Sequence, residues 1–247
     1  MRRLIPEPGS ASLESELGLY RPFDQPPGSR PHVAVNMIST LDGRASIEGR
    51  SKELGSKADS EHLLGLRTRF DAVMVGGGTM RSERYGRIVR QPEFHRQRLA
   101  AGLAAEPLAV IISGNLDLPF DAPLFTDGHG KVLIFTRKKK APETSTPVEL
   151  VTREEGIEMT EVMAHLRHRE GVRALLCEGG PHLFGQLLAA GLVDDLFLTI
   201  TPVATGGEAP RILEGELPSR AGFKLDRLLE AEGDLFARYR RTGPEVN

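Results

Sequence analysis

Two glycine-rich turns in this chain each follow a short apolar run and precede an amphipathic segment. The first contains Gly76, Gly77 and Gly78, and the second contains Gly179 and Gly180. A strand that runs through glycines into a helix presents free backbone N–H groups and the positive end of the helix dipole, which suits a phosphate. Glycine after a strand is often only a turn residue, so either turn alone is a weak signal. The pair predicts a ligand with two anionic regions, and a dinucleotide fits that description.

Arginines surround the first turn. Arg67 precedes it on a predicted helix, where a guanidinium either lies on the surface or binds a phosphate or carboxylate through two parallel hydrogen bonds. A second group of charged residues follows the turn: Arg81, Glu83, Arg84, Arg87 and Arg90. A solvated helix surface explains this composition as well as a second, phosphorylated ligand does.

Two acids are placed where strands are expected to end. The dipeptide Asp42-Gly43 is a strong hairpin-turn signal, and spacing alone favours that interpretation. The alternative is an acid at the carboxyl end of a strand, where open α/β sheets bind ligands. Glu178 directly precedes the second glycine turn. Because a carboxylate repels a phosphate, we expect Glu178 to face an amine or a sugar hydroxyl.

Other kinds of site have no support in the sequence. The only cysteine, Cys177, lies in an apolar run and is predicted to be a core residue. No His-x-x-x-His pairing occurs among the seven histidines, and we predict no metal site; His182 follows the second turn and is expected on the surface or against a phosphate. The glycines at 76–78 lack the Gly-Lys-Ser/Thr of a nucleotide-hydrolysing loop.

Length and composition are those of an ordinary globular protein. The chain has 247 residues, 39% hydrophobic and 27% charged, with a net charge of −2. This charge predicts no nucleic-acid or membrane-surface partner. No run of 18 apolar residues occurs, and the basic start at Met1 is not followed by an apolar segment typical of a signal peptide. We expect a cytoplasmic protein.

The pattern of apolar runs predicts an α/β fold. Residues 1–31 are rich in Pro, Gly, Ser and Glu and are expected to form an arm with a short helix at 13–19, before one domain at 32–247. Strands alternating with helices favour a mixed, mostly parallel sheet, and the end of the chain predicts an antiparallel hairpin around Glu232-Gly233. The expected strands are 32–38, 71–75, 108–113, 131–136, 148–151, 173–177 and 195–202. The expected helices are 60–70, capped by Asp59 or Ser60, then one from about 79, 94–104, 160–169 and 183–190.

Five short motifs in register resemble a known family. They are Ser39-Thr-Leu-Asp42-Gly43, Arg67, the run from Asp71 to Thr79, Glu178-Gly-Gly-Pro181 and Gly191-Leu-Val-Asp-Asp-Leu. Together they resemble the reductase domain of the riboflavin-pathway deaminase–reductase over about residues 32–240. The resemblance implies a dihydrofolate reductase-like fold, a three-layer α/β sandwich.

The activity that this resemblance implies is the NADPH-dependent reduction of 5-amino-6-(5-phosphoribosylamino)uracil to the ribitylamino product. The chain lacks the His-x-Glu and Pro-Cys-x-x-Cys signature of the zinc deaminase. It is therefore expected to be a stand-alone reductase, and the family resemblance implies a homodimer.

The resemblance also implies roles for individual residues. Asp42 and Glu83 would act near the reacting centre. On the substrate side it implies Ser51, Arg67, Arg87, Arg90 and Glu178, with Arg67 and Arg90 on the ribose phosphate. Contacts to NADPH are implied for Ser39, Gly76, Gly77, Gly78, Thr79, Ser113, Gly179, Gly180, Pro181, His182, Leu183 and Phe184. Charge alone suggests that Arg137 lies near the 2′-phosphate of the cofactor.

The sequence departs from the family pattern at three places and leaves two alternatives open. Glu83 stands where the family usually has aspartate, Tyr85 where it has proline, and Glu53-Leu54 where a tryptophan is common. One alternative is an NADPH-dependent reductase of another pterin or pyrimidine, such as dihydrofolate. The other is a non-catalytic sensor of NADPH or a flavin precursor. A sensor would need only the glycine turns, and the retained Asp42, Arg67 and Glu178 argue against it.

Overall fold

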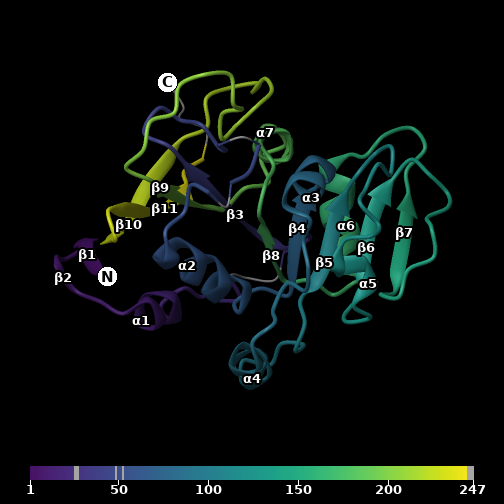
Figure 1. Cartoon of the computed structure of the whole chain (residues 1–247), viewed down its shortest axis with the longest axis horizontal. Coiled ribbons are helices and arrows are strands. Elements are labelled where there is room, and N and C mark those ends of the chain that lie inside the picture. Colours follow the sequence, from purple (N-terminus) through teal and green to yellow (C-terminus); the bar gives the residue numbers. More distant parts are fainter. Residues whose placement is uncertain (25–27, 48, 52, 244–247) are drawn as a thin grey trace. The chain divides into compact units, whose positions relative to one another are not determined.

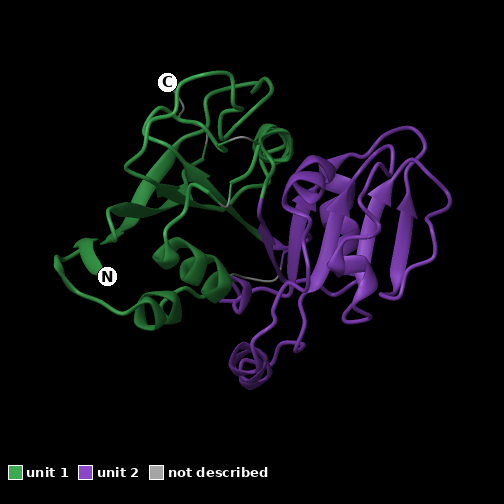
Figure 2. Cartoon of the chain, in the orientation of Figure 1, with its two compact units in different colours: residues 1–21, 33–66, 179–247 green, residues 22–32, 67–178 purple. Residues whose placement is uncertain are grey.

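The computed structural model describes residues 1–24, 28–47, 49–51 and 53–243. The chain forms two compact units, each built from segments that are separate in the sequence (Figure 2). Unit 1 contains residues 1–21, 33–66 and 179–247, and unit 2 contains residues 22–32 and 67–178. The expected division into an arm at 1–31 and a domain at 32–247 stays a prediction.

Unit 1 is built on a sheet that is antiparallel except at one end. Its strands run in the order β2-β1-β10-β11-β9-β3, and only β3 and β9 pair in parallel (Figure 1). The strands are β1 (Arg2–Ile5), β2 (Gly9–Ser10), β3 (His32–Ser39), β9 (Asp195–Ile200), β10 (Phe223–Ala231) and β11 (Asp234–Arg241). The helices are α1 (Leu13–Gly18), α2 (Lys57–Arg67), whose last residue belongs to unit 2, and α7 (Pro181–Ala189).

The C-terminal hairpin forms where the sequence predicted it. Ala231 pairs with Asp234, so the connection has two residues, Glu232 and Gly233. Their φ angles are +56° and +89°. Two successive left-handed residues match the right-handed twist of the flanking strands, which favours a tight hairpin.

The N-terminal segment contains more structure than the sequence predicted. Helix α1 lies at the expected place, and the hydroxyl of its N-cap, Ser12, accepts the backbone N–H of Ser15 at 3.1 Å. Strand β1, which was not predicted, pairs antiparallel with β10 and covers its free edge. A four-residue strand leaves too short an alternation to be recognised in sequence.

Unit 2 is an all-parallel sheet with strands in the order β8-β4-β5-β6-β7 (Figure 1). The strands are β4 (Ala72–Gly76), β5 (Leu108–Ile112), β6 (Val132–Thr136), β7 (Val148–Thr152) and β8 (Ala174–Cys177). The helices are α3 (Gly77–Glu83), α4 (Pro92–Ala100), α5 (Pro123–Thr126) and α6 (Met159–His168). All four residues of β8, and all five of β6, are buried, as expected for parallel strands covered on both faces.

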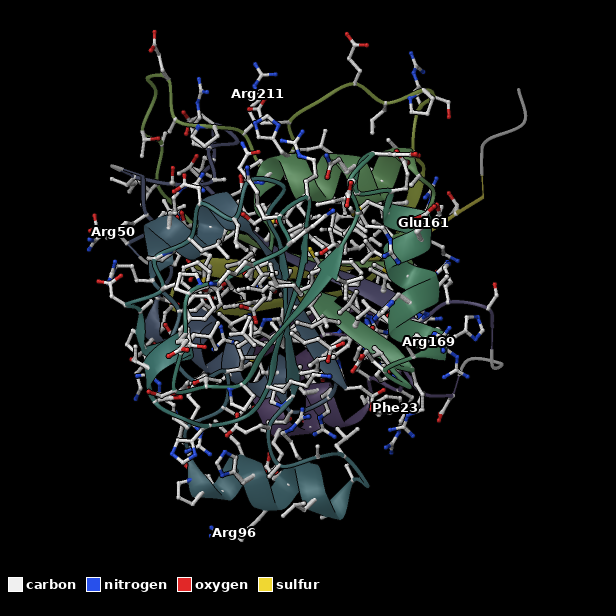
Figure 3. All side chains as sticks on the ribbon, turned by 90° about the vertical axis from the view of Figure 1, so that its right-hand side faces the viewer. Phe23, Arg50, Arg96, Glu161, Arg169 and Arg211 are labelled. Carbon is white, nitrogen blue, oxygen red and sulfur yellow. The ribbon has the colours of Figure 1, made fainter. Side chains whose placement is uncertain are left out.

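Helix α6 shows how the helices of unit 2 meet their sheet. Val162, Met163 and Leu166 are buried, whereas Glu161 and Arg169 are exposed (Figure 3). The 3.6-residue period places the apolar side chains on one stripe. Helix α4 is different: Arg96 and most of its side chains are exposed, and only Arg98 is buried.

Helix boundaries are the main differences from expectation. Helix α2 begins at Lys57, because the hydroxyl of Ser56 accepts the N–H of Asp59 at 3.2 Å. The predicted caps, Asp59 and Ser60, are therefore wrong. Helix α3 begins at Gly77 rather than Thr79, and α5 was not predicted. Among the described residues, none of the helices has the length and hydrophobicity needed to cross a bilayer.

Candidate functional site

The residues predicted to form the site are distributed over both units. Unit 1 contains Ser39, Asp42, Ser51, and the segment Gly179, Gly180, Pro181, His182, Leu183 and Phe184. Unit 2 contains Arg67, the turn Gly76, Gly77, Gly78 and Thr79, then Glu83, Arg87, Arg90, Ser113, Arg137 and Glu178. Each group is described within its own unit.

The central feature of unit 2 is a buried ion pair between Arg67 and Glu178. Arg67 Nε and Nη2 donate to Glu178 Oε1 and Oε2, both at 2.7 Å, and Arg67 Nη1 donates to the carbonyl of Ile88 at 3.0 Å. The side chains are 12% and 3% exposed. Two parallel charge-assisted hydrogen bonds fix the guanidinium and the carboxylate in one plane. Both residues were predicted to contact substrate, but their contact with each other was not predicted.

Tyr85 completes this group. Its hydroxyl donates to Glu178 Oε2 at 2.8 Å, and the Arg67 guanidinium carbon lies 5.6 Å from the centre of its ring. Glu178 thus accepts hydrogen bonds from an arginine on α2 and from a tyrosine that follows α3. Sequence analysis noted Tyr85 only as a departure from the family pattern, because no periodicity connects residue 85 with residue 178.

The electrostatics of the trio keep Arg67 charged and the phenol of Tyr85 protonated. Burial opposes the charge of Arg67, but the carboxylate of Glu178 outweighs it and raises the pKa of the guanidinium. Burial, and then the negative charge of Glu178, raise the pKa of Tyr85 well above its ordinary value. The phenol therefore keeps its proton and remains a hydrogen-bond donor.

A second arginine supports the backbone of the first. Arg98, fully buried, donates from Nη1 to the carbonyls of Arg67 and Phe70 at 2.6 and 2.8 Å, and from Nε to Ala104 at 2.8 Å. Burial lowers the pKa of Arg98 to about 10, so the side chain still carries its charge at neutral pH. The bond to Arg67 satisfies a carbonyl at the C-terminal end of α2, which otherwise lacks a helical partner. The sequence shows Arg98 only as one charged residue of a polar helix.

The first glycine turn joins β4 directly to α3. Gly76 is the N-cap of α3 and offers no side chain to the first N–H groups of the helix. Gly77 packs on Ser113, because a Cβ at this position would lie 3.0 Å from the Ser113 hydroxyl. Ser113 itself is buried. The turn is therefore tightly packed on one side and presents bare backbone N–H groups at the helix start.

The other predicted cationic residues of unit 2 have different surroundings. Arg87 is paired with Glu106 at 2.6 Å, and His95 contacts the same carboxylate at 2.8 Å. Arg90 is exposed. Arg137 is exposed directly after β6 and donates to the side-chain oxygen of Asn115. The structure thus gives Arg87 an acidic partner that the sequence analysis did not identify.

In unit 1, Asp42 lies in a tight turn and holds a loop. The N–H of Gly43 donates to the carbonyl of Thr40 at 3.0 Å, which confirms the turn. The carboxylate accepts the Thr40 hydroxyl at 2.7 Å and the N–H groups of Thr205 and Gly206 at 3.1 and 2.8 Å. These hydrogen bonds, that of Thr40 first, lower the pKa of Asp42 to about 2. Asp42 is therefore an ionised anchor for the 205–206 loop, and its catalytic role stays a prediction.

The second glycine turn leads into α7. Gly179 has φ +85°, its peptide bond to Gly180 is cis, and Gly180 is the N-cap of α7 without a side-chain cap. Pro181 occupies the first helical turn, where its missing N–H leaves no donor unsatisfied. Beyond it His182 is exposed, whereas Leu183 and Phe184 are 4% and 2% exposed. The two apolar side chains are core residues, so any ligand contact from this segment comes from backbone groups or from His182.

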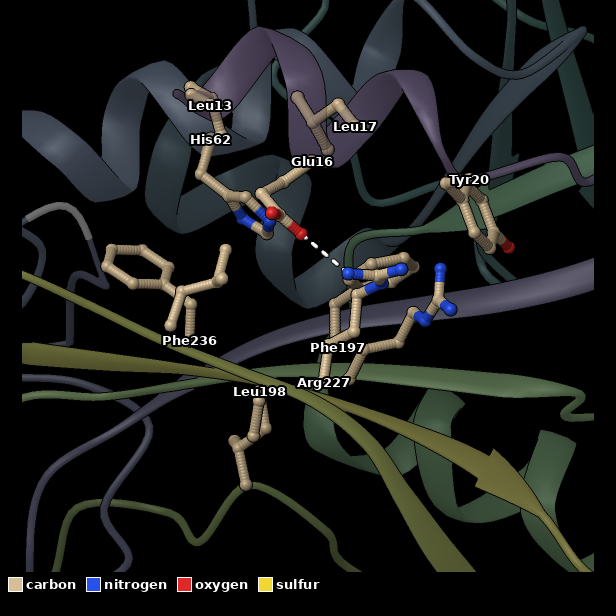
Figure 4. A pocket seen from close by; sticks show the side chains of 12 residues that line it. Leu13, Glu16, Leu17, Tyr20, His62, Phe197, Leu198, Arg227 and Phe236 are labelled. Atoms are coloured by element: carbon tan, nitrogen blue, oxygen red, sulfur yellow. Dashed lines mark hydrogen bonds and ion pairs between the residues drawn. The ribbon is translucent and has the colours of Figure 1, made fainter. Parts of the chain in front are cut away.

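A small cavity in unit 1 has none of the predicted site residues in its lining. It lies between α1, α2 and strands β9 to β11, and it includes Leu17, His62, Phe197 and Phe236 in its mainly apolar lining (Figure 4). Glu16 and Arg227 form an ion pair of 2.8 Å at its wall. The volume of ≈ 30 Å³ suffices for about one water molecule. This cavity is too small for a nucleotide or a sugar phosphate.

No group of three or more His, Cys, Asp or Glu side chains in the described part of the chain has the arrangement of a metal site. Helix starts without side-chain caps after glycines, and a cation paired with a buried carboxylate, are the candidate features for chemistry in the two units. Those features suit an anionic, nucleotide-like ligand rather than a metal ion.

The fold is the dihydrofolate reductase-like fold found in solved pyrimidine reductases. A pyrimidine reductase-like protein from Corynebacterium diphtheriae matches with a TM-score of 0.71 at 24% identity, over 86% of this chain and 92% of that one. The riboflavin biosynthesis reductase of Saccharomyces cerevisiae also gives 0.71, at 17% identity, over 93% and 99% of the two chains. The predicted fold class, including the C-terminal hairpin, is confirmed.

Residues 31–235 match the model of the RibD C-terminal domain, and the chain belongs to this family. A relative from Archaeoglobus fulgidus is 31% identical over 193 residues, which cover 76% of this chain and 88% of the relative. That relative is named 2,5-diamino-6-ribosylamino-4(3H)-pyrimidinone 5′-phosphate reductase. The resemblance stated from the sequence motifs is confirmed, and the chain is placed among the oxidoreductases of riboflavin biosynthesis.

Proposed function

We propose that this protein uses NADPH to reduce the sugar of a 5′-phosphorylated ribosylaminopyrimidine to the ribityl form. The observation that carries the proposal is the family match across residues 31–235, together with a 31% identical relative that is named for this reduction. The buried Arg67–Glu178–Tyr85 group adds a structural reason. It is a costly arrangement of charge inside unit 2, and perturbed groups of this kind are concentrated at functional sites.

The helix starts fit an anionic dinucleotide. Gly76 and Gly180 are the N-caps of α3 and α7, so neither helix has a side-chain cap from its own N-cap residue. Backbone N–H groups at such positions bind pyrophosphate well. In the proposal the segments Gly76 to Thr79 and Gly179 to His182 hold the pyrophosphate. Arg137, exposed beside Asn115, binds the 2′-phosphate and gives the preference for NADPH over NADH.

The reaction depends mainly on how the protein positions the cofactor and the substrate. The bound nicotinamide supplies the hydride, and the ring-opened ribosylamine presents a C=N bond at C1′ to accept it. Arg67 and Arg90 bind the 5′-phosphate of the substrate, and Ser51 and Arg87 contribute to the same side. Glu83, or alternatively Asp42, would stabilise the iminium that accepts the hydride or relay a proton to the sugar oxygen. Holding the reactants in place and excluding water then provides most of the rate acceleration.

Two pyrimidines are candidate substrates. The resemblance of the sequence motifs implies 5-amino-6-(5-phosphoribosylamino)uracil. The name of the Archaeoglobus relative implies the 2,5-diamino compound instead, which has an amino group at C2 where the uracil has an oxygen. Because that relative is a reductase covered over most of its length, the diamino compound is the second candidate and should be tested beside the first.

The test is a comparison of acceptors with the purified protein, followed by the absorbance of the reduced nicotinamide. We expect loss of NADPH absorbance with one or both phosphoribosylaminopyrimidines, and slower loss with NADH. Faster turnover of dihydrofolate would favour the pterin reductase alternative. Binding of NADPH without turnover of any acceptor would favour the sensor.

The proposal also includes the cellular location and the oligomeric state of the protein. We infer a cytoplasmic homodimer, on the strength of the family resemblance and of the expected intracellular chemistry. Sedimentation of the purified protein at micromolar concentration tests the dimer, and a monomer at all concentrations would contradict it.

A further inference from the structure

Tyr85 and Arg67, from different segments of the chain, both donate to the buried carboxylate of Glu178. The Tyr85 hydroxyl lies 2.8 Å from Glu178 Oε2, the same oxygen that accepts Arg67 Nη2 at 2.7 Å. The two bonds from Arg67 fix the carboxylate relative to the guanidinium, but the two groups can still rotate together. A further donor from a different element, the hydroxyl of Tyr85, opposes that joint rotation. Glu178 is 3% exposed at its side chain, so water is not available to replace the phenol.

The orientation of Glu178 determines that of Arg67. The guanidinium uses Nε and one N–H of Nη2 for the carboxylate, and one N–H of Nη1 for the carbonyl of Ile88. A guanidinium has five N–H donors, so at most two remain for a ligand, one on each terminal nitrogen. Because the group is planar and rigid, any rotation of the carboxylate turns these remaining donors as well.

The ring of Tyr85 is held in place independently of its hydroxyl. The carbonyl of Tyr85 accepts the N–H of Leu124 at 3.0 Å, and the preceding residue, Arg84, ends α3 in a left-handed conformation with its N–H on Met80. These backbone bonds place residue 85 whether its ring carries a hydroxyl or not. Phenylalanine therefore fills the same space, and the hydroxyl is needed only for the bond to Glu178.

We propose that Tyr85 is a positioning residue: through Glu178 it orients the Arg67 guanidinium so that the remaining N–H groups of Arg67 bind the phosphate of the substrate. This inference rests on the proposed function and assigns the roles within it. Arg67 contacts the ligand, and Glu178 is the counter-ion that orients Arg67. Tyr85 holds Glu178 in its orientation through a hydrogen bond.

The test is the variant Tyr85→Phe, with Tyr239→Phe as a matched control. Tyr239 lies on β11 in unit 1 and is half-buried. Its replacement by phenylalanine removes a hydroxyl oxygen, as the replacement of Tyr85 does. Each protein is assayed with the phosphorylated substrate and with its dephosphorylated riboside. We expect Tyr85→Phe to lower the preference for the phosphorylated form by about three- to tenfold, because one hydrogen bond to a charged group is lost. The change should appear in the KM of the phosphorylated substrate and not in that of NADPH.

A merely structural role would lower kcat/KM for both acceptors equally, and that result would overturn the proposal, as would a preference within about twofold of the wild type. A further prediction concerns the double variant Tyr85→Phe/Arg67→Lys. Its preference should equal that of Arg67→Lys alone, because the hydroxyl acts through Arg67. If the losses of preference in the two single variants added up in the double variant, the hydroxyl of Tyr85 would not act through Arg67.

A binding measurement separates this proposal from the proposed function. The Nε–H resonance of Arg67, assigned by its absence in Arg67→Lys, is followed while ribose 5-phosphate is added. We expect a saturable shift in the wild type and weaker binding in Tyr85→Phe, even if neither pyrimidine is turned over. An unchanged Arg67 resonance in a protein that reduces the phosphorylated pyrimidine would overturn the positioning role and leave the proposed function intact.

Discussion

The contact between Arg67 and Glu178 changes the role that can be inferred for each of the two residues. Each was expected to bind substrate by itself, yet they bind each other with two bonds of 2.7 Å. An ion pair in a buried place does little for stability compared with apolar residues of equal size, but removal of one partner leaves a buried charge without compensation. The pair is therefore more easily explained by what Arg67 does for a ligand than by folding.

Arg67→Ala should raise the KM of the phosphorylated substrate far more than it lowers kcat, because the lost contact binds a part of the substrate that does not react. It should also lower the free energy of unfolding by about 3 kcal/mol, since Glu178 stays buried without its counter-ion. Steady-state kinetics and chemical denaturation measure the two effects. The control is Arg81→Ala, whose surface ion pair with Asp117 should contribute less than about 1 kcal/mol. An unchanged KM would show that Arg67 is not a phosphate ligand.

His62 should make the fold sensitive to acid. Its imidazole is buried between Phe197 and Phe236, with ring centres 5.9 and 5.2 Å away, and burial lowers its pKa to about 4. An unfolded chain binds the proton near pH 6.5, so unfolding takes up a proton in the window between the two values. Stability is then fully present above about pH 6.5 and falls as the pH decreases toward 4, by about 3 kcal/mol in total.

Denaturation of His62→Leu across this pH range tests the assignment. The variant should lose most of this pH dependence, because leucine does not titrate. His129→Leu, at an exposed histidine, is the matched control and should behave as the wild type. If the free energy of unfolding fell equally with pH in the wild type and in His62→Leu between pH 6.5 and 4, other groups would cause the acid sensitivity.

Among the elements, α7 shows why a glycine in mid-helix is required. Gly185 is buried, and a Cβ there would overlap the carbonyl oxygen of Glu214. The N–H of Glu214 in turn donates to the carbonyl of Pro181 at 3.2 Å, so this segment is tied to the start of the same helix. The second glycine turn and its helix are thus positioned by backbone packing as well as by apolar side chains.

Gly185→Ala should therefore destabilise the protein by at least about 2 kcal/mol, although alanine favours helix at an open position. Gly18→Ala is the control, because a Cβ at the end of α1 meets no atom within 4 Å. Thermal unfolding of the two variants provides the comparison. Equal stabilities would show that the Glu214 segment moves aside without loss.

Most elements of the two sheets followed from the sequence, and the exceptions have physical causes. Strands such as β5 and β6 are continuous apolar runs because parallel strands are buried on both faces. The helix cap at Ser56 was missed, because Ser56, Asp59 and Ser60 are all residue types that favour an N-cap and only the hydrogen bond distinguishes them. Strand β1 was missed because its partner, β10, lies more than 200 residues further along the chain.

At the scale of the whole molecule, the chain passes between its two units four times, at residues 21–22, 32–33, 66–67 and 178–179. Both glycine turns therefore belong to one folded molecule although each is built by a different unit. A ligand that binds only the folded state raises the free energy of unfolding of the protein through mass action.

NADPH should raise the midpoint of thermal unfolding by a few degrees when its concentration is about 100 times the dissociation constant, which corresponds to about 2.7 kcal/mol. NADH should raise it less. Arg137→Ala should remove most of the difference between the two coenzymes, while Lys140→Ala, further along the same charged run, should not. Equal shifts with both coenzymes in the wild type would remove the role proposed for Arg137.

The sequence alone determined the α/β class, the C-terminal hairpin, the two glycine-led helix starts and the family, because local periodicity, turn chemistry and motif order are properties of neighbouring residues. Only the tertiary structure decided that Arg67, Glu178 and Tyr85 form one buried group, that Arg87 faces Glu106, and that Asp42 anchors the 205–206 loop. These partners lie between 19 and 164 positions apart in the sequence. Contacts over such distances depend on how the strands align, and a hydrogen bond is selected only after burial has removed the competing water.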